Sequence, residues 1–210
     1  LSSIMYNDNA CPPVIIHRMI ELYLEDLDAL EEKYSQPKYR VGDLLKEIEN
    51  IQSSIIRLIE NDKYKNIIDL HYCLLLFKMY NFREGQLNIC RRLKLTQELL
   101  QIYMGNEKID VRNVQQAQKN FDNILEVCDE YGDQEKAVWE QVLHYFLDLN
   151  VTDFSGNNQI DECIHKCLAN IVNKIEENEL MPPLKLLQIF KEYNSKIKYD
   201  IIRNYLVTFI

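Results

Sequence analysis

The residues best suited to chemistry lie on one apolar, helix-like segment in the last quarter of the chain. Glu162 and His165 are three positions apart, the Glu-x-x-His spacing by which a helix of a di-iron bundle presents two metal ligands. Such a site also needs a second Glu-x-x-His pair and two glutamates from other helices, and the sequence has no second pair. We therefore interpret Glu162 and His165 as the polar edge of a helix.

The cysteines offer a second possible metal site. Cys163 and Cys167 are four positions apart on one helical face, but no C-x-x-C pair elsewhere would complete a zinc site. Both fall within an apolar stripe, which predicts buried thiols rather than metal ligands. All the cysteines are spread along the chain and mostly fall on apolar faces, as reduced thiols do in a cytosolic protein; they are Cys11, Cys73, Cys90, Cys128, Cys163 and Cys167.

The remaining candidates for catalysis are isolated. His71 and His144 lie on aromatic-rich segments, where an imidazole of the core or of a helix edge is far commoner than a catalytic one, and His17 has no visible partner. No glycine-rich phosphate loop, G-x-S-x-G elbow or H-E-x-x-H motif is present. We expect no catalytic residue, no metal ligand and no cofactor site in this chain.

Composition and charge indicate a mostly helical protein and exclude some kinds of partner. The 210 residues are 47% hydrophobic and include only 5 Gly and 5 Pro, too few turn residues for a sandwich or barrel of many short strands. A net charge of -9 would repel a nucleic acid backbone, so nucleic acid is not an expected partner. The longest nearly uncharged run, residues 70–77, is too short to cross a bilayer. Any membrane association is therefore expected to be indirect.

Apolar residues recur at helical spacing along most of the chain. Residues 65–80 are apolar nearly all round, which predicts a helix covered on both sides by neighbours. The remaining expected helices show one apolar face each. The first begins at Pro12 and Pro13, and the second covers Val41 to Glu60. The others are expected at 83–95, 96–104, 121–131, 135–149, 160–175 and 202–209, with one more that begins at the prolines at 182 and 183.

Corners between these segments carry the turn residues. Pro182 and Pro183 cannot lie inside a helix, so one helix should end near Asn178 and the next should begin at the prolines. Gly132 marks a corner, and Gly105 suits a left-handed helix end.

Helical hairpins of about 30 to 40 residues, none able to bury its apolar stripe alone, are what an α-solenoid requires. We therefore predict an all-α fold, an α-solenoid of stacked antiparallel helical hairpins, with a degenerate repeat. A globular helical bundle is the alternative that the pattern leaves open.

Several stretches, in conserved order along the chain, resemble one family. They are FREG (82–85), LNICRRLKLTQELLQIYM, ILEVCDEYGDQEKAVWEQVLHYF, IVNKIEENELMPPLKLLQIF and IIRNYLV. They are similar to the C-terminal helical region of the vacuolar protein sorting-associated protein 11 family. The match is best over residues 64–210 and looser over 1–63, and both are interpreted as parts of one α-solenoid, residues 1–210. The corners at 105–120 and 151–160 are longer than those of the family and are interpreted as insertions.

The resemblance implies a structural role for the residues at its most specific marks, the helix of Trp139 and the Met-Pro-Pro corner. The positions singled out are Trp139, Phe146, Pro182, Pro183, Gly85 and Gly132. The family's helices resemble clathrin heavy-chain repeats and continue downstream into a coiled coil and a zinc-binding RING domain, both outside this chain. Zinc and any ubiquitin ligase activity would belong to that downstream RING.

The function implied by the resemblance is that of a scaffold. The family supplies a shared subunit of the HOPS and CORVET endolysosomal tethering complexes, so the implied partners are the other class C vacuolar sorting subunits. The implied location is the cytoplasmic side of late endosome, vacuole or lysosome membranes, reached through those partners. The alternatives are an α-solenoid subunit of another vesicle coat or tether and, more remotely, a helical enzyme.

Overall fold

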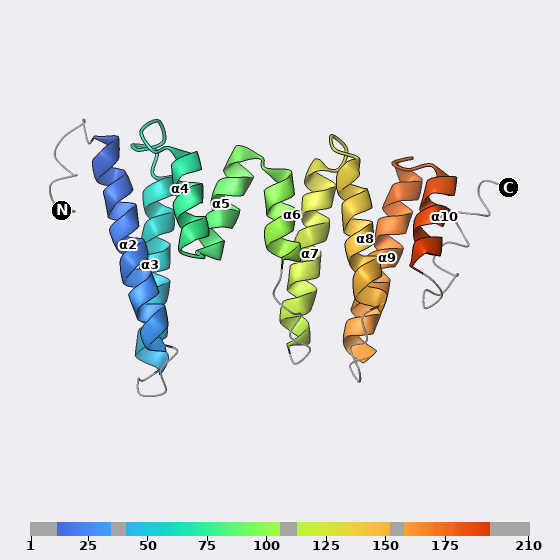
Figure 1. Ribbon diagram of the computed structural model, residues 1–210, viewed down its shortest axis with the longest axis horizontal. Helices are drawn as coiled ribbons and strands as arrows, with labels where there is room; N and C mark the ends of the chain where they lie inside the picture. The colour runs from blue at the N-terminus through green and yellow to red at the C-terminus, as the bar shows by residue number, and fades with distance from the viewer. Residues whose placement is uncertain (1–11, 35–40, 106–112, 152–157, 194–210) are drawn as a thin grey trace. The chain divides into compact units, whose positions relative to one another are not determined.

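The computed structural model describes residues 12–34, 41–105, 113–151 and 158–193, and these residues contain nine α-helices and no strand. The chain divides into two compact units, residues 1–95 and 96–210, which we describe separately (Figure 1). None of the described helices is long and apolar enough to cross a membrane.

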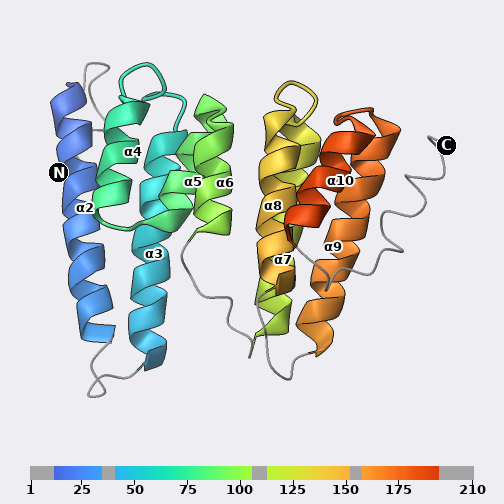
Figure 2. The same ribbon diagram turned by 45° about the vertical axis from the view of Figure 1, so that its right-hand side comes forward.

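The first unit contains four helices: α2 (Pro13–Tyr34), α3 (Val41–Glu60), α4 (Leu70–Met79) and α5 (Arg83–Leu93). Consecutive helices pack as the hairpins α2–α3 and α4–α5, and α2 also contacts α4 while α3 contacts α5. The hairpins therefore lie one on the other, as Figure 2 shows. Residues of the apolar stripe of α2, such as Ile16, Ile20 and Leu24, are fully buried in this stack.

The second unit contains α6 (Thr96–Met104), α7 (Val114–Tyr131), α8 (Ala137–Val151), α9 (Asn158–Glu177) and α10 (Pro183–Glu192). Here α6 packs on α7, α7 on both α8 and α9, and α8 on α9. Each of the helices from α6 to α9 thus contacts its neighbour in sequence, and α7 also contacts α9. Repetition of this contact pattern is what a stack of helical hairpins requires.

The helix expected at residues 65–80 is shorter than predicted. Turns occupy residues 62–68, and α4 begins only at Leu70 because the Asp69 side chain accepts hydrogen bonds from the backbone N–H groups of His71 and Tyr72. Helix α4 packs against two neighbours, α2 and α5, as predicted, but it is not covered all round, since Leu75 is 55% exposed and Met79 is 71% exposed. Apolar composition alone did not reveal which face stays open.

The corner expected at residues 105–120 is partly helical. Asn113 accepts a hydrogen bond from the N–H of Gln116, which starts α7 at Val114 rather than near Phe121, and Ala117 is buried. Gly105 does not adopt the left-handed conformation predicted for it. Helix α8 also continues to Val151, into the corner expected at 151–160. The segment expected at 202–209 lies outside the described residues.

Candidate functional site

The corner between α7 and α8 is built on the contact between Gly132 and Trp139. Trp139 lies in the first turn of α8 and is 3% exposed. A Cβ atom at Gly132 would lie 2.0 Å from Trp139 Nε1 and 2.4 Å from the carbonyl oxygen of Cys128. Since the φ of Gly132 is an ordinary −66°, the position needs glycine for space and not for backbone freedom. Two residues singled out separately from the sequence therefore form one contact.

The corner between α4 and α5 is likewise built on a glycine that packs against aromatic rings. The rings of Phe77 and Phe82 meet edge to face, with centroids 5.2 Å apart. A Cβ at Gly85 would lie 2.5 Å from the Phe82 ring and 2.7 Å from the Phe77 ring. The buried side chain of Gln86 donates a hydrogen bond of 2.9 Å to the carbonyl of Phe77 and so holds α5 on the end of α4. The FREG stretch is thus a packing corner.

The Met-Pro-Pro corner joins α9 to α10. Helix α9 ends at Glu177, Pro182 is extended (φ −61°, ψ 141°) and Pro183 is the first residue of α10, so the predicted boundary is confirmed. Glu179 adopts a left-handed φ of 48°, which turns the chain away from the axis of α9. Met181 is buried beneath the turn.

Phe146 lies in the core of the second unit. It is fully buried, and its ring meets that of Phe121 on α7 at 5.2 Å. All the positions singled out for a structural role are therefore packing or corner residues of α4–α5 or of α7–α10.

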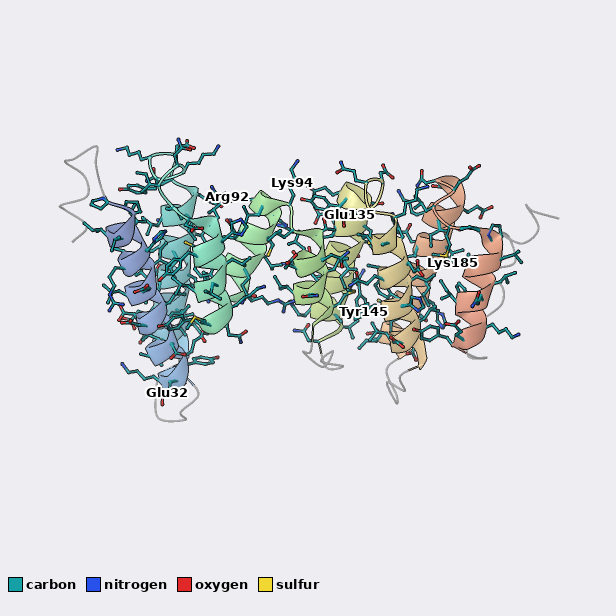
Figure 3. The ribbon with its side chains drawn as sticks, turned by 45° about the horizontal axis from the view of Figure 1, so that its top comes forward. Glu32, Arg92, Lys94, Glu135, Tyr145 and Lys185 are labelled. Atoms are coloured by element: carbon teal, nitrogen blue, oxygen red, sulfur yellow. The ribbon has the colours of Figure 1, made fainter. Side chains whose placement is uncertain are left out.

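Polar side chains join neighbouring helices through contacts that the sequence did not predict. In the first unit, Arg92 on α5, labelled in Figure 3, donates to the carbonyl of Ile59 at the end of α3 (2.9 Å). Asn88 donates to Glu60 (2.8 Å). These pairs are about 30 positions apart in sequence, and neither belongs to a local motif.

In the second unit, α10 is attached to α8 near both of its ends. Lys185, labelled in Figure 3, pairs with Glu140. His144 Nδ1 lies 2.9 Å from the hydroxyl of Tyr193, the residue after α10. No local sequence motif signals either pair.

The residues considered as metal ligands all lie on one helix, α9. Glu162 is exposed, and Cys163 and His165 are half-buried. Among the described residues, no group of three or more His, Cys, Asp and Glu side chains is arranged to hold a metal ion. Cys167 is buried as predicted, but Cys163 is only half-buried, so the prediction that it too is buried was wrong. Both cysteines border a shallow depression between α7 and α9 that Asp122 and Lys166 also line.

Burial dominates the chemistry of the described thiols. Burial, followed by the charge of a nearby carboxylate, raises the pKa of Cys73, Cys128 and Cys167 to about 12. A thiol with so high a pKa remains protonated at neutral pH and is a poor nucleophile. These cysteines therefore serve as small apolar core residues.

His17 and His144 take part in contacts between helices. His17 was expected to have no partner, and this was wrong: its Nε2 accepts a hydrogen bond of 3.1 Å from the backbone N–H of Asp69. The ring of His17 also lies 4.9 Å from that of Tyr72. His144 bonds to Tyr193 as described above, and His71 is exposed on α4.

A small charge network lies where α2 meets α4. The hydroxyl of Tyr72 donates a hydrogen bond of 2.5 Å to Glu21, and Arg18 pairs with both Glu21 and Glu25. The bond from Tyr72, and then that from Arg18, lowers the pKa of Glu21 below its usual value. Glu21 is therefore ionised at neutral pH and helps to fix the register of α4 on α2.

The sequence of the chain matches, over residues 2–188, the family described as PEP5/VPS11 clathrin repeat. The chain belongs to this family. Together with the hairpins of each unit, this match confirms the all-α solenoid class and the resemblance described above. As a member of the PEP5/VPS11 clathrin repeat family, the chain is a segment of a vacuolar sorting protein.

Individual relatives agree with the family assignment. The chain is 28% identical over 159 residues to a vacuolar protein sorting-associated protein 11 homolog of Mus musculus, a match that covers 76% of the chain and 14% of that protein. The homolog of Dictyostelium discoideum is 23% identical over 194 residues, covering 92% of the chain and 16% of that protein. The chain therefore spans about one seventh of the length of the curated relatives it matches. No solved structure gives a significant match.

Proposed function

We propose that this chain is a scaffold segment of an endolysosomal membrane-tethering complex of the HOPS or CORVET type. Its task would be to hold other class C vacuolar sorting subunits in fixed positions while vesicles are tethered before fusion. The observation that supports this most is the family match over residues 2–188, together with homologs of vacuolar sorting proteins in animals and an amoeba.

The packing of each unit suits such a role. A continuous apolar core between stacked hairpins resists bending, because bending would open contacts along the whole stack. Glycines that admit aromatic rings at the corners, Gly85 and Gly132, bring successive helices close together. Stiffness within a unit is what a scaffold requires of its repeats.

The proposal includes no enzymatic reaction and no cofactor in this segment; zinc would belong to a RING domain elsewhere in the parent protein. The segment would work on the cytoplasmic side of late endosome, vacuole or lysosome membranes and would reach them through partner subunits. The acidic surface, with a net charge of -9, fits protein partners better than nucleic acid.

Affinity purification of the full-length parent protein from its own cells, followed by quantitative mass spectrometry, tests the proposal. We expect the other class C vacuolar sorting subunits at near-equal amounts. Recovery of vesicle coat components in their place, or of no stable partner, would overturn the tethering assignment. The family membership and the helical fold would be unaffected by that result.

A further inference from the structure

Two large apolar side chains face solvent on α4, although this helix packs against both α2 and α5. Leu75 is 55% exposed and Met79 is 71% exposed. They are four residues apart, so they lie one turn apart on the same face of the helix. We call this pair the α4 stripe. Single exposed apolar residues are ordinary, but a pair at this spacing matches the contact that a partner helix makes in a groove.

The stripe lies beside α2, and contacts between the two helices fix their register. Asp69 bonds to His17, and Tyr72 bonds to Glu21, so the contacts advance in the same direction along both helices. Helices α2 and α4 therefore run parallel and side by side (Figure 2). Met79 is seven residues beyond Tyr72 on α4, and Asp28 is seven residues beyond Glu21 on α2. Each therefore lies about 10 Å further along its helix than the Tyr72–Glu21 bond, so Met79 and Asp28 are at the same height along the two parallel helices.

The edge of α2 beside the stripe is acidic. Glu21, Glu25 and Asp28 recur at intervals of four and three residues, which places them along one side of α2. Glu25 and Asp28 are exposed, and Arg18 pairs with both Glu21 and Glu25 and so offsets part of the charge of these two. Burial, followed by the charge of Asp28, raises the pKa of the neighbouring Glu31.

The opposite border of the stripe carries a positive charge. Lys78 precedes Met79 by one position and is exposed, so it points about 100° around α4, on the side away from Tyr72 and α2. The surface thus has an acidic row on α2, an apolar row on α4 and a basic residue beyond it. Such a pattern selects both the chemistry and the orientation of a helix that lies along it.

We propose that the α4 stripe, with Glu25 and Asp28 beside it, binds an amphipathic helix of a partner subunit whose apolar face is bordered on one edge by Lys or Arg. Apolar side chains of this helix cover Leu75 and Met79, and its basic edge faces Asp28. The thioether of Met79 adapts to whichever apolar side chain it meets. The inference rests on the proposed function in that the bound helix comes from another subunit.

Photo-crosslinking identifies what covers the stripe. Met79 is replaced by p-benzoylphenylalanine in the full-length protein, the assembled complex is irradiated in its native cells, and the crosslinked peptides are sequenced. We expect a peptide of another subunit with apolar residues at intervals of three and four and with Lys or Arg on one edge. The inference is overturned by a crosslink to a second copy, to the protein's own chain or to an acidic segment, or by no crosslink.

A charge reversal tests the role of the acidic row in the same crosslinking protein. We expect Asp28→Lys to lower the crosslink yield about fivefold, because an attraction becomes a repulsion. Asp26→Lys is the matched control: Asp26 is also exposed on α2 but lies two positions away, on the opposite side of the helix. An equal loss with both variants would show that only net charge matters and would overturn the inference.

Recovery of the subunits in the same purification separates this inference from the proposed function. If the class C subunits co-purify but position 79 gives none of the expected crosslinks, the inference fails and the tether assignment stands. If those subunits are not recovered at all, both fail.

Discussion

At the residue scale, the two structurally important glycines are required by what lies beside them. Gly132 was recognisable in the sequence as a corner residue and Gly85 as part of the FREG stretch that carries the family resemblance, but the sequence did not show that each one admits an aromatic ring. Gly42, in the first turn of α3, has nothing within 4 Å of a Cβ built on it. Glycines of the same chain therefore respond in opposite directions to the same substitution.

We expect Gly132→Ala to lower the free energy of unfolding by about 1–3 kcal/mol, because its Cβ would collide with the indole of Trp139 and with the carbonyl of Cys128. Gly42→Ala should raise it by about 0.4–1 kcal/mol, because alanine restricts the unfolded chain without a clash. Urea unfolding followed by circular dichroism measures both. Equal effects of the two substitutions would contradict the packing described at Gly132.

Truncation of Trp139 should be among the most damaging single changes. We expect Trp139→Ala to lower the free energy of unfolding by about 3–5 kcal/mol, because it removes a large buried ring from the corner between α7 and α8. Leu184→Ala is the control: Leu184 is 79% exposed, so its loss should change stability by less than about 0.5 kcal/mol. Unchanged stability of the Trp139 variant would rule out its placement in the core.

At the element scale, helix boundaries could be predicted where a local signal marks them. Helix α3 covers the predicted residues 41–60, and α10 begins at the predicted proline pair. The start of α4 was missed because the capping Asp69 lies inside an otherwise apolar run. The start of α7 was missed because its first turns are polar and only Ala117 is buried there. Apolar periodicity gives no signal for a turn of that kind.

Contacts between elements were the least predictable part. The bond from the N–H of Asp69 to His17 joins residues 52 positions apart, and the one between His144 and Tyr193 joins residues 49 apart. Contacts between residues so far apart in sequence depend on how the hairpins stack, and no local sequence pattern determines that stacking. The identity of the corner residues was therefore predictable, whereas their partners were not.

The attachment of α10 to α8 makes a prediction at this scale. Tyr193→Phe removes the hydroxyl that bonds to His144, and we expect α10 to lose about 0.5–1.5 kcal/mol of local stability. Hydrogen exchange of the α10 amides measures this as faster exchange. Lys185→Ala breaks an exposed ion pair with Glu140 and should have a smaller effect, below about 1 kcal/mol. Unchanged protection of α10 in the Tyr193 variant would contradict the role given to this bond.

At the scale of the whole molecule, the buried thiols predict how stability depends on pH. The pKa of Cys73, Cys128 and Cys167 is about 12 in the folded chain, against an ordinary value of 9.0. Above pH 9 these thiols ionise in the unfolded chain but keep their protons in the folded one. The unfolded state then binds fewer protons, so stability should fall as pH rises from 9 towards 12.

Urea unfolding under reducing conditions at neutral pH and at several values above pH 9 measures this fall. A Cys128→Ala variant should show a shallower dependence, since one of the three thiols is gone. Stability that stays constant or rises over the alkaline range would contradict the burial of these residues.

We propose that the stacked helices of this segment help to hold a tethering complex together. The most direct measurement compares subunit recovery, by quantitative mass spectrometry, from cells whose full-length protein carries Trp139→Ala together with Phe146→Ala or carries Leu184→Ala alone. Limited proteolysis shows in each case whether the segment has opened. We expect the double variant to open and to lose class C vacuolar sorting subunits from the complex, while the Leu184 variant keeps them. Full recovery of every subunit from a segment that has opened would contradict the account.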